Sequence, residues 1–318
     1  MAAHPLLVGR HRLTRSGELW MVGCIVGYVA SYLFDRVAVA HVDPLIGPLF
    51  RRLPSLLMGV ILIFVQQTAA QLNPSSEKFV GRTTIGIFLI SGVLQTFGAF
   101  SYYYALRFGG VTLTAPITQT LVLWGAIAGW VYLGERFSPK GLMGIAIVSI
   151  GIMLLSYGQS RGVAVSEQWV YAVPLALVSA MTWGIGGVLW RDGQLRGAHQ
   201  STSIFLQFSS SIFLTILVLA LMGRLEAIAE ASGRDLLILS GSGILSGIIG
   251  VYCMFMALRL MSVARVYTLY SLVTIVSVVL AYVVLGEYIN RVMLIGILLT
   301  CFGVVLVQTF KPARERVA

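Results

Sequence analysis

The stretch "YLGERFSPKGLMGI" (residues 132–145) ends one apolar run of the sequence and begins the next. A second stretch, "VLGEYINRVMLIGI" (residues 284–297), repeats the Leu-Gly-Glu and again places Gly-Ile nine residues after the Glu. Both stretches lie between long segments that carry almost no charge. The same hinge therefore occurs twice in one chain, 152 residues apart.

The composition places these apolar segments in a membrane. Hydrophobic residues make up 58% of the 318 residues and charged residues 11%, with a mean hydropathy of +0.89. Soluble domains carry about 25% charged residues, so the sequence predicts an all-α integral membrane protein in contact with lipid. The net charge of +10 comes from Lys and Arg placed singly or in pairs between apolar runs, which argues against nucleic acid as a partner. Cysteines and histidines are scattered, so no metal or cofactor is predicted.

Ten apolar runs are long enough to cross a bilayer, which takes about 20 residues in a helix. They are continuous rather than alternating, which favours helices over a β-barrel. The first run begins at Leu19 and has no small-residue cleavage site before Asp35, so we expect an uncleaved span. The predicted helices cover residues 19–39, 44–66, 82–106, 112–133, 140–157, 169–190, 202–222, 236–258, 264–285 and 292–310.

Basic residues predict the orientation. With the N-terminus inside, 14 of the 22 Lys and Arg fall at inner helix ends, Arg191 and Arg265 among them, and 6 fall at outer ends. The other two, Arg51 and Arg52, lie within the second helix. Because cytoplasmic flanks carry the excess of positive charge, we expect a multi-pass protein of the cytoplasmic membrane with both termini in the cytoplasm.

The repeat extends well beyond the hinge. A shift of 152 residues brings "ALR" at 105–107 onto "ALR" at 257–259, "LGE" at 133–135 onto 285–287, and three glycines of the first half onto glycines of the second. Each half, residues 1–160 and 161–318, contains five predicted helices. Because five is odd, the second half should enter the membrane inverted, which is the architecture of an alternating-access transporter. The other interpretation is that the duplication records only how the bundle evolved.

Two five-helix halves that each end in an "ALR…LGE…G…G" segment resemble the EamA family of the drug/metabolite transporter superfamily. The resemblance covers nearly the whole chain and is weaker over the first two helices of each half. It implies a ten-helix basket whose cavity is lined by helices 1–4 and 6–9, with helices 5 and 10 outside. It also implies export of amino acids, metabolites or drugs from the bacterial cytoplasm.

The Leu-Gly-Glu hinge predicts a structural role for Gly134, Glu135, Gly286 and Glu287. Each glycine lies where a helix meets a tight turn and permits a close approach or an unusual dihedral angle. Each glutamate can accept hydrogen bonds from the free N–H groups of the next helix and stabilise its positive end. Substrate contact is the alternative.

Arg51 and Arg52 in "GPLFRRLPS" are the sharpest polar signal. They lie about 10 Å along the second helix, where an unpaired charge costs several kcal/mol. Adjacent helical residues point about 100° apart, so one can face the interior while the other reaches the interface. Asp35 is the expected counter-ion, and an Asp35–Arg52 pair is either a structural clamp or a gating and proton-coupling element. Neutralisation of Asp35 by Arg36 is a further alternative.

Polar side chains on the inner helices predict a substrate-binding cavity. Tyr267, Tyr270, Ser271 and Thr274 share one face of the ninth predicted helix, and Gln119 is the polar group on the equivalent fourth helix. The alternative for each residue is a structural role, in an interhelical hydrogen bond that holds the bundle together.

Four more residues join this prediction. Gln95 and Tyr102 are seven residues apart on the third predicted helix and share a face. Trp183 and Gln207, on the sixth and seventh, are weaker candidates.

These features predict a secondary transporter rather than an enzyme, because the predicted helices contain no paired acids, histidine cluster or activated nucleophile. The expected substrate is a small metabolite, amino-acid-like or amphiphilic, whose carboxylate Arg52 can meet. A channel or facilitator for small neutral solutes is the alternative. The protein is expected to act as a monomer or homodimer.

Overall fold

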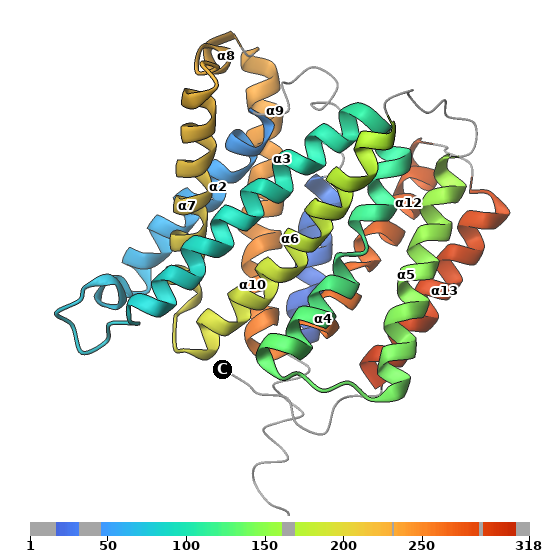
Figure 1. Cartoon of the computed structure of the whole chain (residues 1–318), viewed down its shortest axis with the longest axis horizontal. Coiled ribbons are helices and arrows are strands. Elements are labelled where there is room, and N and C mark those ends of the chain that lie inside the picture. The colour runs from blue at the N-terminus through green and yellow to red at the C-terminus, as the bar shows by residue number, and fades with distance from the viewer. Residues whose placement is uncertain (1–16, 32–45, 161–168, 231, 286–288, 310–318) are drawn as a thin grey trace, which may run out of the picture.

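The computed structural model describes residues 17–31, 46–160, 169–230, 232–285 and 289–309, which form helices without a strand (Figure 1). Two short helices, η1 (Ala69–Leu72) and α8 (Glu226–Glu230), lie in connections. The long helices are an N-terminal helix Gly17–Ser31, α2 (Gly47–Val65), α3 (Arg82–Thr118), α4 (Leu121–Leu133), α5 (Pro139–Ser160), α6 (Trp169–Leu195), α7 (Gln200–Leu221), α9 (Gly233–Gly243), the π-helical η2 (Ile244–Val251), α10 (Tyr252–Leu260), α11 (Val263–Tyr270), α12 (Leu272–Leu285) and α13 (Arg291–Thr309).

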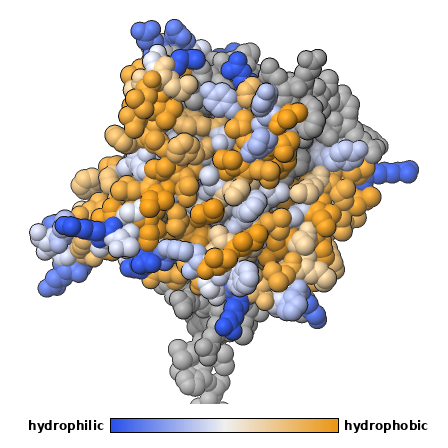
Figure 2. All heavy atoms as spheres, viewed as in Figure 1, coloured by the Kyte–Doolittle hydropathy of each residue, from blue (hydrophilic) through white to orange (hydrophobic). Residues whose placement is uncertain are grey.

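Length and composition make the bundle a multi-pass membrane structure. Eight helical segments among the described residues are long and apolar enough to cross a bilayer, and Gly17–Ser31 and Leu121–Leu133 are shorter apolar helices. Large apolar side chains such as Phe64, Val131 and Leu221 are more than 70% exposed on the outside. Figure 2 shows apolar residues spread over most of the visible face, as a lipid-facing surface requires.

The structure corrects two predicted helix boundaries. The predicted helices 82–106 and 112–133 are divided at Gln119 and Thr120 instead, because α3 continues to Thr118 after changing direction near the top of Figure 1. The predicted helix 264–285 is divided at Ser271 into α11 and α12. Under the offset of 152, Gln119 falls on Ser271, so both breaks occupy the same position of the repeat.

A hydroxyl group bonds to the preceding turn at both breaks. Thr120 Oγ1 donates to the carbonyl of Ile117 at 2.6 Å, and Ser271 Oγ donates to that of Thr268 at 2.7 Å. A side chain that occupies a carbonyl three residues back competes with the backbone ladder of the helix. The predicted helix 236–258 is also irregular, because η2 separates α9 from α10.

Equivalent helices of the two halves pack directly against each other. A Cβ atom added to Gly144 in α5 would lie 3.0 Å from the carbonyl oxygen of Gly303 in α13, and one added to Gly151 would lie 2.9 Å from that of Gly296. Numbers rise along α5 as they fall along α13, so the two helices are antiparallel. They lie together at one edge of the bundle in Figure 1.

Two more pairs of equivalent helices pack against each other in antiparallel directions. In α2, Arg52 contacts Ser211 of α7, and Gly59 approaches Ile204 of the same helix. The offset of 152 relates Arg52 to Ile204 and Gly59 to Ser211, so the two contacts are counterparts.

Beside the two helix breaks, Gln119 bonds to Thr274, and Gly125 of α4 packs against Tyr267 of α11. Here too, numbers rise along one partner and fall along the other. Helices of both halves are therefore interleaved throughout the bundle.

Candidate functional site

Arg52 lies at the centre of a polar cluster inside the bundle. Its Nη1 donates to Ser211 Oγ at 2.6 Å and Thr96 Oγ1 at 3.1 Å, and its Nη2 donates to the carbonyl of Gln95 at 2.6 Å. Thr96 and Ser211 are buried and also bond to each other at 2.7 Å. Three helices, α2, α3 and α7, therefore meet at one guanidinium whose partners in the described part of the chain are neutral.

Trp183 connects this cluster to the second half of the repeat. Its Nε1 donates to the Gln95 carbonyl at 3.4 Å, and its own carbonyl accepts from Tyr267 Oη at 2.8 Å. The ring of Tyr102 lies 5.3 Å from that of Trp183, centroid to centroid. The structure thus brings Arg52, Gln95, Tyr102, Trp183 and Tyr267, predicted separately, into one chain of contacts.

Gln119 and Thr274 form another polar contact between the halves. Gln119 Nε2 donates to Thr274 Oγ1 at 2.9 Å, next to both helix breaks. Two discontinuous helices at equivalent repeat positions are a typical place for a binding site in inverted-repeat transporters. The residues of the predicted stripe on the ninth helix are shared between α11 and α12, on either side of the turn at Ser271.

The remaining predicted residues lie elsewhere. Arg51 Nη2 donates to Ser31 Oγ at 3.5 Å, so the doublet points to different neighbours. The ring of Tyr270 meets that of Tyr28 edge-on at 5.1 Å. Ser271 is fully buried, and its hydroxyl group bonds to the carbonyl of Thr268 in the preceding turn. Gln207 lies in α7 and is 2% exposed. Asp35, Gly286 and Glu287 lie outside the described residues, as does the predicted Asp35–Arg52 pair.

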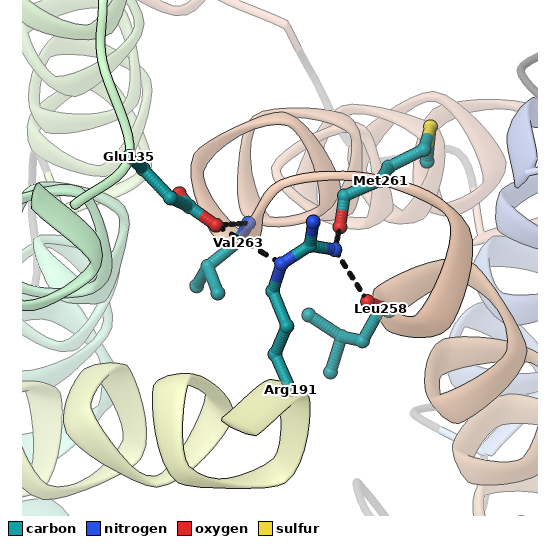
Figure 3. A network of polar contacts seen from close by, with 5 residues as sticks. All are labelled: Glu135, Arg191, Leu258, Met261 and Val263. Carbon is teal, nitrogen blue, oxygen red and sulfur yellow. Dashed lines mark hydrogen bonds and ion pairs between the residues drawn. The ribbon is translucent and has the colours of Figure 1, made fainter. Parts of the chain in front are cut away.

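A separate network surrounds Glu135 (Figure 3). Gly134 caps α4 in the left-handed region, with φ 66°, which glycine adopts without a Cβ clash. Glu135 Oε1 accepts from the backbone N–H of Val263 at 3.1 Å and lies 3.2 Å from Arg191 Nε. The prediction that Glu135 meets the next helix is therefore corrected: Val263 begins α11, in the other half, because the halves interleave.

Arg191 is the residue that sequence analysis missed. It was counted as an inner flank charge, yet α6 continues to Leu195 and Arg191 is only 2% exposed. Its Nη1 donates to the carbonyls of Leu258, at 2.6 Å, and Met261. The signal in the sequence was an Arg directly after an unbroken apolar run.

Arg265 needs the same correction. It lies inside α11, 2% exposed, where its Nη2 donates to Glu18 at 3.1 Å and its Nε to Gln308 at 3.0 Å. Thus two of the predicted flank charges are tied into the bundle.

The turn after α6 carries the titratable groups at this end. A hydrogen bond and the charge of Asp192 raise the pKa of Arg196, which is 44% exposed and 3.0 Å from that carboxylate. Burial, and then the charge of Arg259, lowers the pKa of His199 from its ordinary value of 6.5. His199 Nδ1 lies 2.9 Å from Ser201 Oγ.

The outer surface also carries an apolar groove of about 550 Å³, lined by Phe108, Tyr171, Pro174, Leu175 and Val178. It lies between α3 and α6. The groove is separate from the polar clusters, and its apolar lining matches a surface covered by lipid.

These features define a class of protein, a multi-pass membrane transporter rather than an enzyme. A model of the EamA-like transporter family matches the chain twice, over residues 15–157 and 170–309. The chain belongs to this family.

Relatives extend the comparison. The glucose uptake protein GlcU of Staphylococcus xylosus is 27% identical over 249 residues, 76% of this chain and 80% of GlcU. The spermidine export protein MdtI of Salmonella arizonae is 29% identical over 102 residues, 30% of this chain and 85% of MdtI. A solved crystal structure shares the fold with a TM-score of 0.74 at 16% identity, covering 93% of this chain and 97% of its own.

Proposed function

We propose that this protein is a secondary transporter that moves a small metabolite across the cytoplasmic membrane by alternating access, as an exporter. Its architecture would be ten transmembrane helices in two inverted repeats, residues 1–160 and 161–318. The two family matches, which fall on either side of this boundary, support the division. We place both termini in the cytoplasm from the excess of basic residues at inner helix ends.

The observation that carries the proposal is the antiparallel packing of repeated helices on their own counterparts. Gly144 meets Gly303 while Gly151 meets Gly296, and each contact maps onto the other under the offset of 152. A two-fold axis in the plane of the membrane produces this exchange, and it reverses the direction of one half. Such an axis supplies two related entrances to one central site, which is the physical basis of alternating access.

The substrate site that we propose lies between the Arg52 cluster and the paired helix breaks. Arg52 contributes a charge among neutral partners, Trp183 and Tyr102 contribute aromatic faces, and Gln119 contributes an amide. A guanidinium beside aromatic rings suits a small zwitterionic or amphiphilic molecule with a carboxylate, such as an amino-acid-like metabolite. Proton coupling through Asp35 and Arg52 belongs to the same proposal.

A facilitator for small neutral solutes is the second candidate. It is favoured by the similarity to GlcU, which is named for glucose uptake and covers three quarters of this chain. GlcU and MdtI are named for opposite directions, so uptake and export need separate tests.

The test is an untargeted metabolite comparison. Liposomes that contain the purified protein and empty liposomes are loaded with the same metabolite extract, and mass spectrometry follows what crosses. A carrier gives saturable movement of one or few metabolites with counterflow, whereas a channel gives a unitary current. An unchanged metabolite profile, or covalent change of a metabolite, would contradict the proposal.

Topology has its own test. Tags on the two termini should face the cytoplasm, while the turns at Glu135 and Glu287 should face opposite sides. Finding those two turns on one common surface would rule out the inverted repeat.

A further inference from the structure

Arg191 and Glu135 are buried, carry opposite charges and lie outside the proposed substrate site. We propose that they form a latch that joins the two halves at one end of the transporter and opens each time that end opens. This inference rests on the proposed alternating-access function. It assigns a role to Arg191, which sequence analysis counted only as a flank charge.

The latch binds two helix ends at once (Figure 3). Arg191 donates to the carbonyls of Leu258 and Met261, at the C-terminal end of α10. Glu135 accepts from the N–H of Val263, the first residue of α11. A cation therefore lies at a negative helix end and an anion at a positive one, each in its favourable position. The ion pair between them, 3.2 Å long, closes the arrangement.

The contact crosses between the halves of the repeat. Glu135 follows α4 in the first half, whereas Arg191, α10 and α11 belong to the second. Val263 ends the stretch "ALRLMSV" (residues 257–263), which the first half repeats as "ALRFGGV" (residues 105–111). The glutamate of the first Leu-Gly-Glu motif thus binds the end of the stretch that the second Ala-Leu-Arg motif begins, and Arg191 binds the leucine of that motif.

Burial makes this contact a switch with two discrete states. Arg191 is 2% exposed and the side chain of Glu135 9%, so a partial separation would leave both charges in an apolar interior. Water has to enter as the pair separates, because only hydration or a new partner can replace the lost contacts. Ser262, 2% exposed between α10 and α11, would then become accessible.

Neighbouring charges do not duplicate the latch. Asp192 pairs with Arg196 one turn along α6 and accepts from Tyr132 Oη of α4. That pair is partly exposed and joins residues four apart at the C-terminal end of α6, so both charges lie in one segment of chain. Arg196 therefore provides a matched control at the same end of the molecule.

The experiment measures the accessibility of position 262. Ser262→Cys is introduced into the full chain after Cys24, Cys253 and Cys301 are replaced by Ala, and the protein is reconstituted in permeabilised liposomes. A hydrophilic maleimide then reports the labelling rate. We expect Glu135→Gln, and the conservative Arg191→Lys, to raise this rate at least about tenfold, because the amide or ammonium cannot hold both helix ends. Arg196→Gln should leave it within about twofold.

A charge swap separates a latch from a plain ion pair. Glu135→Arg combined with Arg191→Glu restores opposite charges but places each at the wrong helix end, so labelling should stay fast. Rates that equal the parent protein in the swap, or in both folded single variants, would overturn the proposal. Size-exclusion profiles identify the variants that fold, and Arg191→Lys remains informative if Glu135→Gln does not.

Labelling needs no substrate, so the two proposals fail separately. If no metabolite moves, the transport function is wrong, whatever the labelling rates. If transport is demonstrated and labelling does not change in the latch variants, the latch alone is wrong.

Discussion

Two arginines lie inside this bundle in opposite chemical settings. Arg191 pairs with a carboxylate and two carbonyls at the end of the bundle. In the described part of the chain, Arg52 bonds only to hydroxyl and carbonyl oxygens of Ser211, Thr96 and Gln95. The first charge is paired with a carboxylate, whereas the described partners of the second are all neutral groups.

This difference separates a structural role from a binding role. A compensated charge offers a ligand nothing without first breaking its pair, which costs several kcal/mol in the interior. A guanidinium that is hydrogen-bonded but not neutralised still attracts an anion. Arg191 is therefore suited to hold helices together and Arg52 to meet a substrate carboxylate.

The largest effect is expected from Arg191→Ala. Removal of the cation leaves Glu135 buried without its ion pair, and loss of one member of such a pair costs about 3–5 kcal/mol. Unfolding in detergent, followed by fluorescence, measures the change. Arg196→Ala, on the exposed neighbouring pair, should cost less than about 1 kcal/mol. Equal losses in both variants would remove the distinction between buried and exposed charges.

Arg52→Ala should affect transport more than stability. Its partners are neutral, and Thr96 and Ser211 still bond to each other, so we expect a cost of about 1–3 kcal/mol. Counterflow of the identified metabolite should fall at least about tenfold, since a charged contact is lost. A variant that unfolds as readily as Arg191→Ala, with normal transport while folded, would show that Arg52 is only a clamp.

The bond between Gln119 and Thr274 should give a smaller, pairwise effect. A double-mutant cycle of Gln119→Leu and Thr274→Val is expected to show a coupling of about 0.5–1.5 kcal/mol in unfolding free energy. Thr215→Val is the control partner, because Thr215 Oγ1 bonds to the carbonyl of Ser211 within its own helix. Coupling of Gln119 to Thr215 as strong as that to Thr274 would contradict a direct contact.

The smallest effect concerns pH at the end of the bundle that holds Arg191. Burial lowers the pKa of His199, so the unfolded chain takes up a proton first as the pH falls through about 6.5. The free energy of unfolding should therefore decrease on acidification until the pKa of His199 in the folded protein is reached. In the His199→Gln variant it should decrease less. Unfolding midpoints at pH 7.5 and 5.5 measure this; an equal loss in both proteins would exclude a contribution from His199.

Prediction from the sequence succeeded where the signal was periodic or repeated. Apolar runs predicted a multi-pass helical protein, and repeated motifs predicted the family that the chain matches twice. Helix boundaries were less predictable. The breaks fall beside Thr120 and Ser271, whose hydroxyl groups bond to the preceding turn, yet Thr182 makes the same bond inside the continuous α6.

The candidate site shows the same limit. The sequence singled out polar or aromatic residues on inner helix faces: Gln95, Tyr102, Trp183 and Tyr267. Only the structure showed which of them contact one another. Gln95 takes part through its backbone carbonyl, which any residue would supply. Thr96 and Ser211, which contact Arg52 directly, were not chosen, because Thr and Ser are common in apolar helices.

The sequence by itself determined that this chain crosses a membrane repeatedly and contains one unit twice, since hydropathy and motif spacing are local properties. Only the tertiary structure decided which charge meets which helix end. Glu135 caps α11 and pairs with Arg191, residues far away in the chain. Those partners are brought together by the packing of two interleaved halves, and no local pattern encodes that packing.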